Sequence, residues 1–252
     1  MKQFGQRTTA FRSFNNDLEQ SFLLAGAVSR GGISAMKDCM SSLDSVIQKV
    51  SGVDAEAIGK MTDEDKVKVC LGASEKDIAK LDSLKKEAEQ YLRLGKETVP
   101  VVLFVYLITK FEAYLEDIIT TACQTNPSLI SLPLNADEEE VIAEVGKRID
   151  KRVDEIGEDV LEKTMQIPFS LICKAAKTTP KELDRAKAIR NIHIHNRGFV
   201  NKRNQKRIGN AAMGEYVPIS IQYLIETKDK IFLTCLGIDK AVIERYPETI
   251  NL

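Results

Sequence analysis

The sequence is poor in the residues that build metal sites, disulfides and aromatic surfaces. Its 252 residues include no tryptophan, two histidines and five cysteines. The cysteines are widely scattered and never form a CxxC pair, which is typical of single buried thiols in a reducing compartment. Aromatic residues make up 6%, too few for a long base-stacking platform on nucleic acid. We expect no bound metal and no cofactor.

No segment predicts export or a membrane span. The first twenty residues lack the apolar region of a signal peptide. The longest apolar run covers residues 99–108, which is about half of the roughly 20 residues that a transmembrane helix needs. We therefore expect a soluble, cytoplasmic protein with no membrane partner.

Apolar residues recur at three- and four-residue steps, which predicts helices. No period-two pattern persists and no internal repeat is present, so the expected class is all-α. The main helices are expected at residues 34–50, 74–95, 99–122, 137–160, 168–177, 180–198 and from 220 onward. Residues 1–98 are expected to form a helical extension of unknown role, and residues 99–252 a second domain.

Local capping signals mark several helix starts. The strongest is Thr179 followed by Pro180 and Glu182, which offers an N-cap threonine, proline at the first helical position and a reciprocal glutamate. This helix should end near Gly198. Similar capping signals are expected at Ser74 with Asp77, at Asp137 with Glu140 and at Ser220.

Positive charge is concentrated in residues 185–207. This segment has no acidic residue and contains both histidines of a chain whose formal net charge is -1. Such uneven charge indicates an anionic partner. The basic residues of the segment are Arg185, Lys187, Arg190, Arg197, Lys202, Arg203, Lys206 and Arg207.

The helical wheel separates the two histidines. At about 100° per residue, Arg190, Asn191 and His195 share one broad side, with Asn191 and His195 one turn apart. His193 falls near the apolar side, which favours a structural role. A zinc site at His193 and His195 is a poorer interpretation, because their rings point about 200° apart.

An imidazole beside a guanidinium suits RNA cleavage without metal. Imidazole moves protons at neutral pH, and a guanidinium stabilises the charge that develops on a phosphorane. A neighbouring amide can orient the phosphate or the ring. One such pair is a small active site, but a two-fold dimer would bring two together.

The residues Arg190-Asn-Ile-His-Ile-His195-Asn-Arg-Gly-Phe-Val200 resemble the active-site motif of the HEPN superfamily of helical ribonucleases, in its RiboL-PSP/MAE-like branch. In that motif a polar residue follows the arginine and a histidine follows after four to six positions. Residues 104–119, FVYLITKFEAYLEDII, are similar to the first core helix of many HEPN proteins, with Phe111 and Glu112 in the usual place.

The resemblance implies a HEPN-like bundle of four to five core helices and a homodimer with a composite site. It implies a metal-independent endoribonuclease that leaves 2′,3′-cyclic phosphate ends, used in toxin–antitoxin or phage-defence systems with a possible antitoxin or defence partner protein. Arg190 would stabilise the transition state, His195 would act as general acid or base, and Asn191 would orient the reacting groups. Glu112, which would pair with Arg190, and Asn196 would support them.

The basic residues around this motif are candidates for RNA binding: Lys187, Arg197, Lys202, Arg203, Lys206 and Arg207. HEPN toxins that are silenced by adenylylation carry a tyrosine where this chain has Arg197, so that form of control is not expected. Two other functions stay open. One is a non-catalytic helical interaction or RNA-binding module. The other is DNA binding, against which the helix end at Gly198 and the lack of helix-turn-helix spacing argue.

Overall fold

The computed structural model describes residues 7–21, 97–209 and 211–251, with a few separated positions between 34 and 93. Regular structure in these parts is helical, without a strand, and an isolated antiparallel bridge joins Phe199 and Tyr216. The all-α class is therefore confirmed for the described residues. The helices expected at 34–50 and 74–95, with the capping signal at Ser74 and Asp77, lie outside the described residues apart from those positions.

The chain divides into two compact units. The described residues 7–21 belong to the same unit as the chain from Pro100 onward, whereas the other unit spans 23–99. The first helix therefore helps to build the C-terminal unit. The division into an extension at 1–98 and a HEPN-like domain at 99–252 stays a prediction.

The core of this C-terminal unit centres on α5 (Val99–Thr125). Its apolar positions between residues 104 and 123 are buried at three- and four-residue steps, as a helix with one broad apolar face requires. Tyr114 is buried, and its hydroxyl donates to the carbonyl of Cys235 at 2.9 Å. The apolar start of α5 is not covered on every side, because Val102 is 59% exposed.

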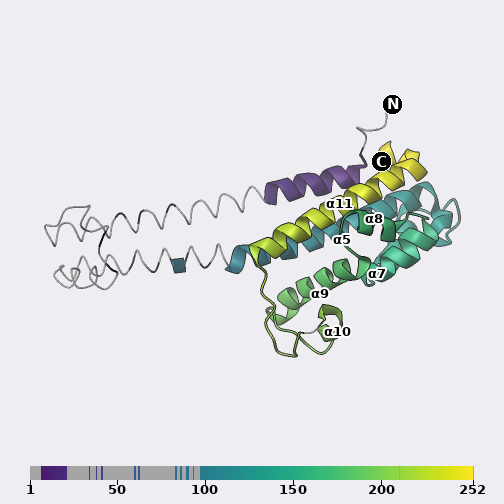
Figure 1. The fold of residues 1–252 in the computed structure, drawn as a ribbon. Coiled ribbons are helices and arrows are strands. Elements are labelled where there is room, and N and C mark those ends of the chain that lie inside the picture. Colours follow the sequence, from purple (N-terminus) through teal and green to yellow (C-terminus); the bar gives the residue numbers. More distant parts are fainter. Residues whose placement is uncertain are drawn as a thin grey trace. The chain divides into compact units, whose positions relative to one another are not determined.

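The last long helix, α11 (Ile221–Arg245), lies beside α5 and the helical residues 9–21 (Figure 1). Ser220 caps it as predicted, accepting from the Tyr223 N–H at 3.0 Å. Two apolar residues of its first turns, Ile221 and Ile225, do not face the core and are 50% and 40% exposed. The buried stripe passes through Leu224 instead, about 100° away from Ile225.

A buried carboxylate attaches the first helix to α11. The N–H and the hydroxyl of Thr8 donate to Oδ1 of Asp239 at 3.1 and 2.5 Å. Burial raises the pKa of Asp239 above its usual value, and the two hydrogen bonds from Thr8 act in the opposite direction. Phe11 adds an edge-on ring contact with Tyr114 at 6.4 Å between centroids. Polar and apolar contacts thus join residues 7–21 to the core.

Thr8→Val is expected to lower the free energy of unfolding by about 1.5–3 kcal/mol, the usual range for a hydrogen bond to a charged group. The variant keeps the shape and the backbone donor but removes the hydroxyl that donates to Asp239. Thr9→Val, at the exposed neighbouring position, is the matched control. Urea unfolding of the full chain measures both, and equal stabilities for the two variants would contradict the prediction.

The capping box at Asp137 and Glu140 forms as predicted and opens α6 (Glu138–Ile149). The prediction of a single helix over 137–160 was wrong. The chain breaks at 150–152 and continues as α7 (Val153–Glu155), followed by a π-helix, η3 (Ile156–Thr164).

The break has a tertiary cause. The N–H of Val153 donates to the buried carboxylate of Asp184 at 3.1 Å, and the Arg152 guanidinium lies 3.4 Å from the same group. Pairing with a residue of a later helix outweighs continuation of the local helical pattern. The other short elements are η2 (Pro127–Ile130), α8 (Phe169–Ala175), α10 (Gln205–Ile208) and η4 (Pro247–Asn251).

Candidate functional site

The predicted site residues lie on α9 (Pro180–Asn196), which begins as the sequence predicts. The Thr179 hydroxyl accepts from the Glu182 N–H at 3.2 Å, and the Glu182 carboxylate accepts from the Thr179 N–H at 3.0 Å. The helix ends at Arg197 and Gly198, both with positive φ, in agreement with the predicted stop. Its apolar face packs into the core and leaves the predicted site residues on the other side.

A cavity of about 450 Å³ opens along that side of α9. It gathers six of the predicted residues from α9 and α5 together with polar residues of the segment that leads into α10. Four cationic side chains and two carboxylates line it, so the lining charge is positive. The lining residues are Glu112, Asp150, Lys187, Arg190, Asn191, His195, Asn196, Asn201, Arg203, Asn204 and Arg207.

Arg190 is fixed by two neighbours. Its Nη1 donates to Oδ1 of Asn191 at 2.7 Å, and its Nη2 forms an ion pair with Glu112 of α5. The predicted pairing of Glu112 with Arg190 is therefore confirmed. The side chains are largely covered, with exposed fractions of 17% for Arg190 and 21% for Glu112. Burial lowers the pKa of Arg190 from its usual value.

Lys187 lies one turn before Arg190 and shares the same carboxylate. Its Nζ lies 2.8 Å from Oε1 of Glu112 and donates to the carbonyl of Lys151 at 2.7 Å. Burial lowers the pKa of Lys187, and the nearby Arg207 guanidinium adds to this effect. Glu112 thus holds two cations at fixed positions in the wall of the cavity.

The two histidines have different surroundings. His195 is exposed and lines the cavity. His193 is partly buried, its Nε2 donates to the carbonyl of Val217 at 2.9 Å, and its ring lies edge-on to Tyr216. Burial lowers the pKa of His193, which favours the neutral ring. These contacts fit the structural role expected for His193 and leave His195 as the imidazole that faces the cavity.

The residues predicted to bind RNA separate into three groups. Lys187 and Arg203 line the cavity, whereas Arg197, Lys202 and Lys206 are exposed outside it. Arg207 also reaches the cavity, but its guanidinium forms two hydrogen bonds with Asp184, at 2.9 and 2.5 Å. We therefore assign Arg207 a structural role, which is to join α10 to α9 through Asp184.

Sequence reasoning missed Asp184 and two asparagines of the cavity wall, Asn201 and Asn204. Asp184 is 2% exposed and accepts from Arg207 and the Val153 N–H. Its sequence context resembles an ordinary polar position of α9, so no local signal marks it. Asn201 accepts from the Asn204 N–H at 3.0 Å, and this spacing of two asparagines is a turn signal that could have been recognised.

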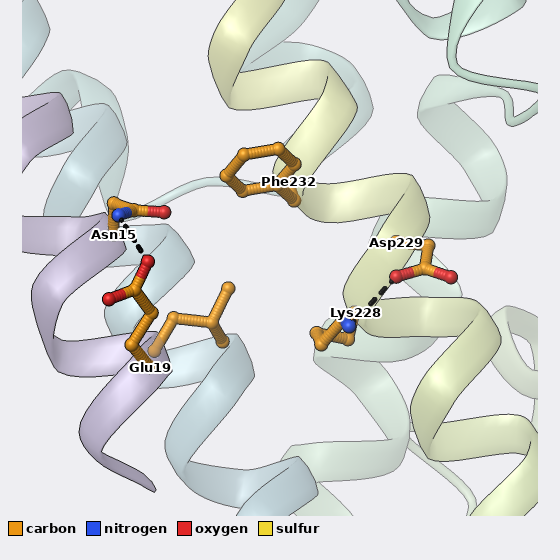
Figure 2. A pocket seen from close by; sticks show the side chains of 6 residues that line it. Asn15, Glu19, Lys228, Asp229 and Phe232 are labelled. Carbon is orange, nitrogen blue, oxygen red and sulfur yellow. Dashed lines mark hydrogen bonds and ion pairs between the residues drawn. The ribbon is translucent and has the colours of Figure 1, made fainter. Parts of the chain in front are cut away.

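A second cavity, of about 350 Å³, lies between residues 15–19 and α11, far along the chain from the predicted site (Figure 2). Asn15 donates to Glu19 at 3.0 Å, and Lys228 pairs with Asp229 at 3.0 Å. Leu18 and Phe232 complete its lining. None of the predicted site residues lies there, so the cavity along α9 is the better candidate.

Among the described residues, no group of three or more histidine, cysteine, aspartate or glutamate side chains is arranged to hold a metal ion. None of the described helices is both long and apolar enough to cross a membrane. Comparison with protein-family models, with curated proteins and with solved structures finds no match to this chain.

Proposed function

We propose that the chain is a metal-independent endoribonuclease of the HEPN type, with a HEPN-like helical bundle and a composite site formed by a homodimer. The observation that carries this proposal is the shared cavity of Arg190, Asn191 and His195. Its cationic lining suits a phosphodiester. A cytoplasmic toxin–antitoxin or phage-defence setting, with a partner protein that restrains the activity, belongs to the same proposal.

The reaction follows from the groups in the cavity. The 2′-oxygen of a ribose attacks the adjacent phosphorus, a bond forms between them, and the bond from phosphorus to the 5′-oxygen breaks. An imidazole accepts the proton of the 2′-hydroxyl, and a second proton donor protonates the departing 5′-oxygen. The Arg190 guanidinium stabilises the charge on the phosphorane. The products are a 2′,3′-cyclic phosphate and a 5′-hydroxyl.

A second subunit supplies the second proton-transfer group. Each chain has one histidine that lines the cavity, yet the reaction needs both an acceptor and a donor of protons. An isologous dimer with facing α9 helices would place two copies of His195 at one phosphate. One would act as the base and the other as the acid.

One observation favours a second candidate, a non-catalytic RNA-binding module. Glu112 already pairs with both Arg190 and Lys187, so the cations best placed for a phosphate share an internal partner. Such a protein would bind RNA through the remaining basic residues and leave it intact. Both candidates share the ligand, so the experiment must separate binding from cleavage.

The test is incubation of the full-length protein with single-stranded RNA in excess chelator. The ribonuclease is supported if cleavage persists, the products carry 2′,3′-cyclic phosphate and 5′-hydroxyl ends, and a single 2′-deoxy substitution at the cleavage site blocks it. Cleavage that stops with the chelator would contradict the proposal. Tight binding with no cleavage would favour the RNA-binding module.

Arg203→Ala should reduce the salt dependence of RNA binding. Arg203 is exposed at the cavity, so it can displace a counterion from one phosphate. The slope of log K against log salt should become shallower by about 0.7, the value for one contact with a single strand. Fluorescence anisotropy with a 2′-O-methyl oligonucleotide measures this without cleavage. Arg185→Ala, exposed and outside the cavity lining, is the control and should keep the wild-type slope.

A further inference from the structure

Two aromatic side chains are exposed beside the cavity. Phe199 is 49% exposed and Tyr216 is 44% exposed, and their ring centroids lie 5.5 Å apart with an interplanar angle of 63°. By contrast, Phe104, Phe111 and Tyr114 of α5 and Phe169 of α8 are buried in the core. Exposure of a contacting pair is therefore unusual among the described aromatic residues and indicates a binding surface. We call this pair the aromatic platform.

Backbone pairing holds the platform in place. Phe199 and Tyr216 form the antiparallel bridge, flanked by hydrogen bonds from the Val200 N–H to the Glu215 carbonyl and from the Val217 N–H to the Gly198 carbonyl, each 2.9 Å. These bonds join the segment after α9 to the segment before α11 (Figure 1). The rings thus project from two backbone segments that are hydrogen-bonded to each other.

Close packing beneath the platform adds to its rigidity. Gly198 has φ +87°, and a Cβ atom there would lie 2.3 Å from Cε2 of Tyr216. Only glycine allows the backbone to approach that ring so closely. On another side His193 lies edge-on to Tyr216 with 5.8 Å between ring centroids. A rigid, partly exposed ring loses little conformational entropy when a ligand covers it.

The charge around the platform favours an anionic partner. Arg197, Lys202 and Arg203 are exposed in the same segment as Phe199, and that segment has no acidic residue. The nearest carboxylate in sequence, Glu215, accepts from the Ala212 N–H at 2.8 Å. A nucleic acid supplies both negative charge for these cations and flat rings for the aromatic platform.

The platform is close enough to the cavity for one ligand to reach both. Phe199 lies in the chain between Asn196 and Asn201, which both line the cavity. Two residues span at most about 7 Å of extended chain, so the Cα of Phe199 is within that distance of Asn201. A base attached near a phosphate in the cavity is therefore within reach of the rings.

We propose that Phe199 and Tyr216 form a stacking site for an unpaired nucleobase of a single-stranded nucleic acid held in the cavity. This rests on the proposed function for the nature of the ligand, but not on cleavage. Stacking on such a pair accepts any base, because every base has a π-face. The platform would exclude a paired duplex, whose bases are not free to stack on it.

The test compares two probes on the full-length protein. One is a labelled 2′-O-methyl oligonucleotide of mixed sequence, and the other is the same length of sugar–phosphate chain without bases. Tyr216→Ala and Phe199→Ala should each raise the dissociation constant of the first probe about 5- to 150-fold, the loss of one stacked base. Affinity for the probe without bases should stay within about twofold, because phosphate contacts are unchanged.

Further variants separate stacking from folding and from self-association. Tyr216→Phe keeps the ring and should bind as the wild type does, whereas Phe199→Leu keeps apolar volume without a π-face and should bind as Phe199→Ala does. Met213→Ala, an exposed apolar residue of the same region, is the control and should not change binding. Circular dichroism melts show whether each variant folds.

Three results would overturn the platform: equal losses for both probes, no loss for either alanine variant, or a wild-type dimer that Tyr216→Ala converts to monomer in sedimentation. The last result would make the face an interface between copies. These binding measurements do not depend on nuclease activity, because the probe cannot be cleaved. Base-dependent binding without cleavage would support the aromatic platform and contradict the ribonuclease. RNA cleavage together with binding that is unchanged in Tyr216→Ala would support the ribonuclease and contradict the platform.

Discussion

Replacing His195 with alanine is expected to slow RNA cleavage by about 10²- to 10⁴-fold, the range for loss of a general acid or base. His195 is the histidine that lines the cavity, exposed on the last turn of α9 beside the Asn191–Arg190 pair. The affinity for a 2′-O-methyl oligonucleotide should change little, because the variant loses a proton-transfer group and keeps the cationic side chains that bind phosphate. Single-turnover cleavage and anisotropy measure the two effects separately.

His193→Gln is the control for this prediction. The amide of glutamine can donate to the Val217 carbonyl as His193 Nε2 does, so the loop after α9 should keep its position. This variant should cleave RNA at close to the wild-type rate. Comparable losses of cleavage rate in the His193 and His195 variants would indicate that both substitutions act by disturbing the fold, and this would contradict the role given to His195.

Asp184→Ala is expected to lower the free energy of unfolding by about 3–5 kcal/mol, as removal of one member of a buried ion pair does. Asp184 is 2% exposed and accepts from the Val153 N–H and from Arg207. Without the carboxylate these donors lose their acceptor, and the junction between α9, α7 and α10 loses its common link. Denaturant unfolding of the full chain measures the loss.

Two comparisons test the mechanism. Asp154→Ala removes a more exposed carboxylate that pairs with Arg152 at 2.8 Å, and it should cost no more than about 1 kcal/mol. Arg207→Ala should destabilise strongly, and the double variant with Asp184→Ala should cost less than the sum, because both changes remove one interaction. Strict additivity would show that the two side chains stabilise the fold independently.

The sequence predicts those parts of the fold that depend on near neighbours. Thr179 and Glu182 satisfy each other's backbone donors within one turn, so the start of α9 is encoded locally. The angular separation of Arg190 and His195 from the core follows from helical geometry alone. That Arg190 and His195 lie on the same side of α9 could therefore be predicted without knowledge of the tertiary structure.

Features that depend on distant residues could not be predicted in this way. The helix expected through residue 160 breaks because Val153 meets Asp184, and that contact exists only after the helices pack. Arg207 appears in the sequence as one more cation of a basic segment, yet it is held by the same carboxylate. Helical periodicity describes a helix before its neighbours are known, so it cannot identify these partners.

The hydrogen bond between Thr8 and Asp239 joins residues that are 231 positions apart. At a synthesis rate of about 5–20 residues per second, a ribosome needs roughly 12–46 s to make the chain between them. For most of that interval Phe11 lacks Phe232 of α11, whose ring centroid lies 5.9 Å from its own in the folded chain. The nascent chain therefore exposes an apolar side chain before its final partner exists, and exposed apolar surface of this kind is what chaperones bind.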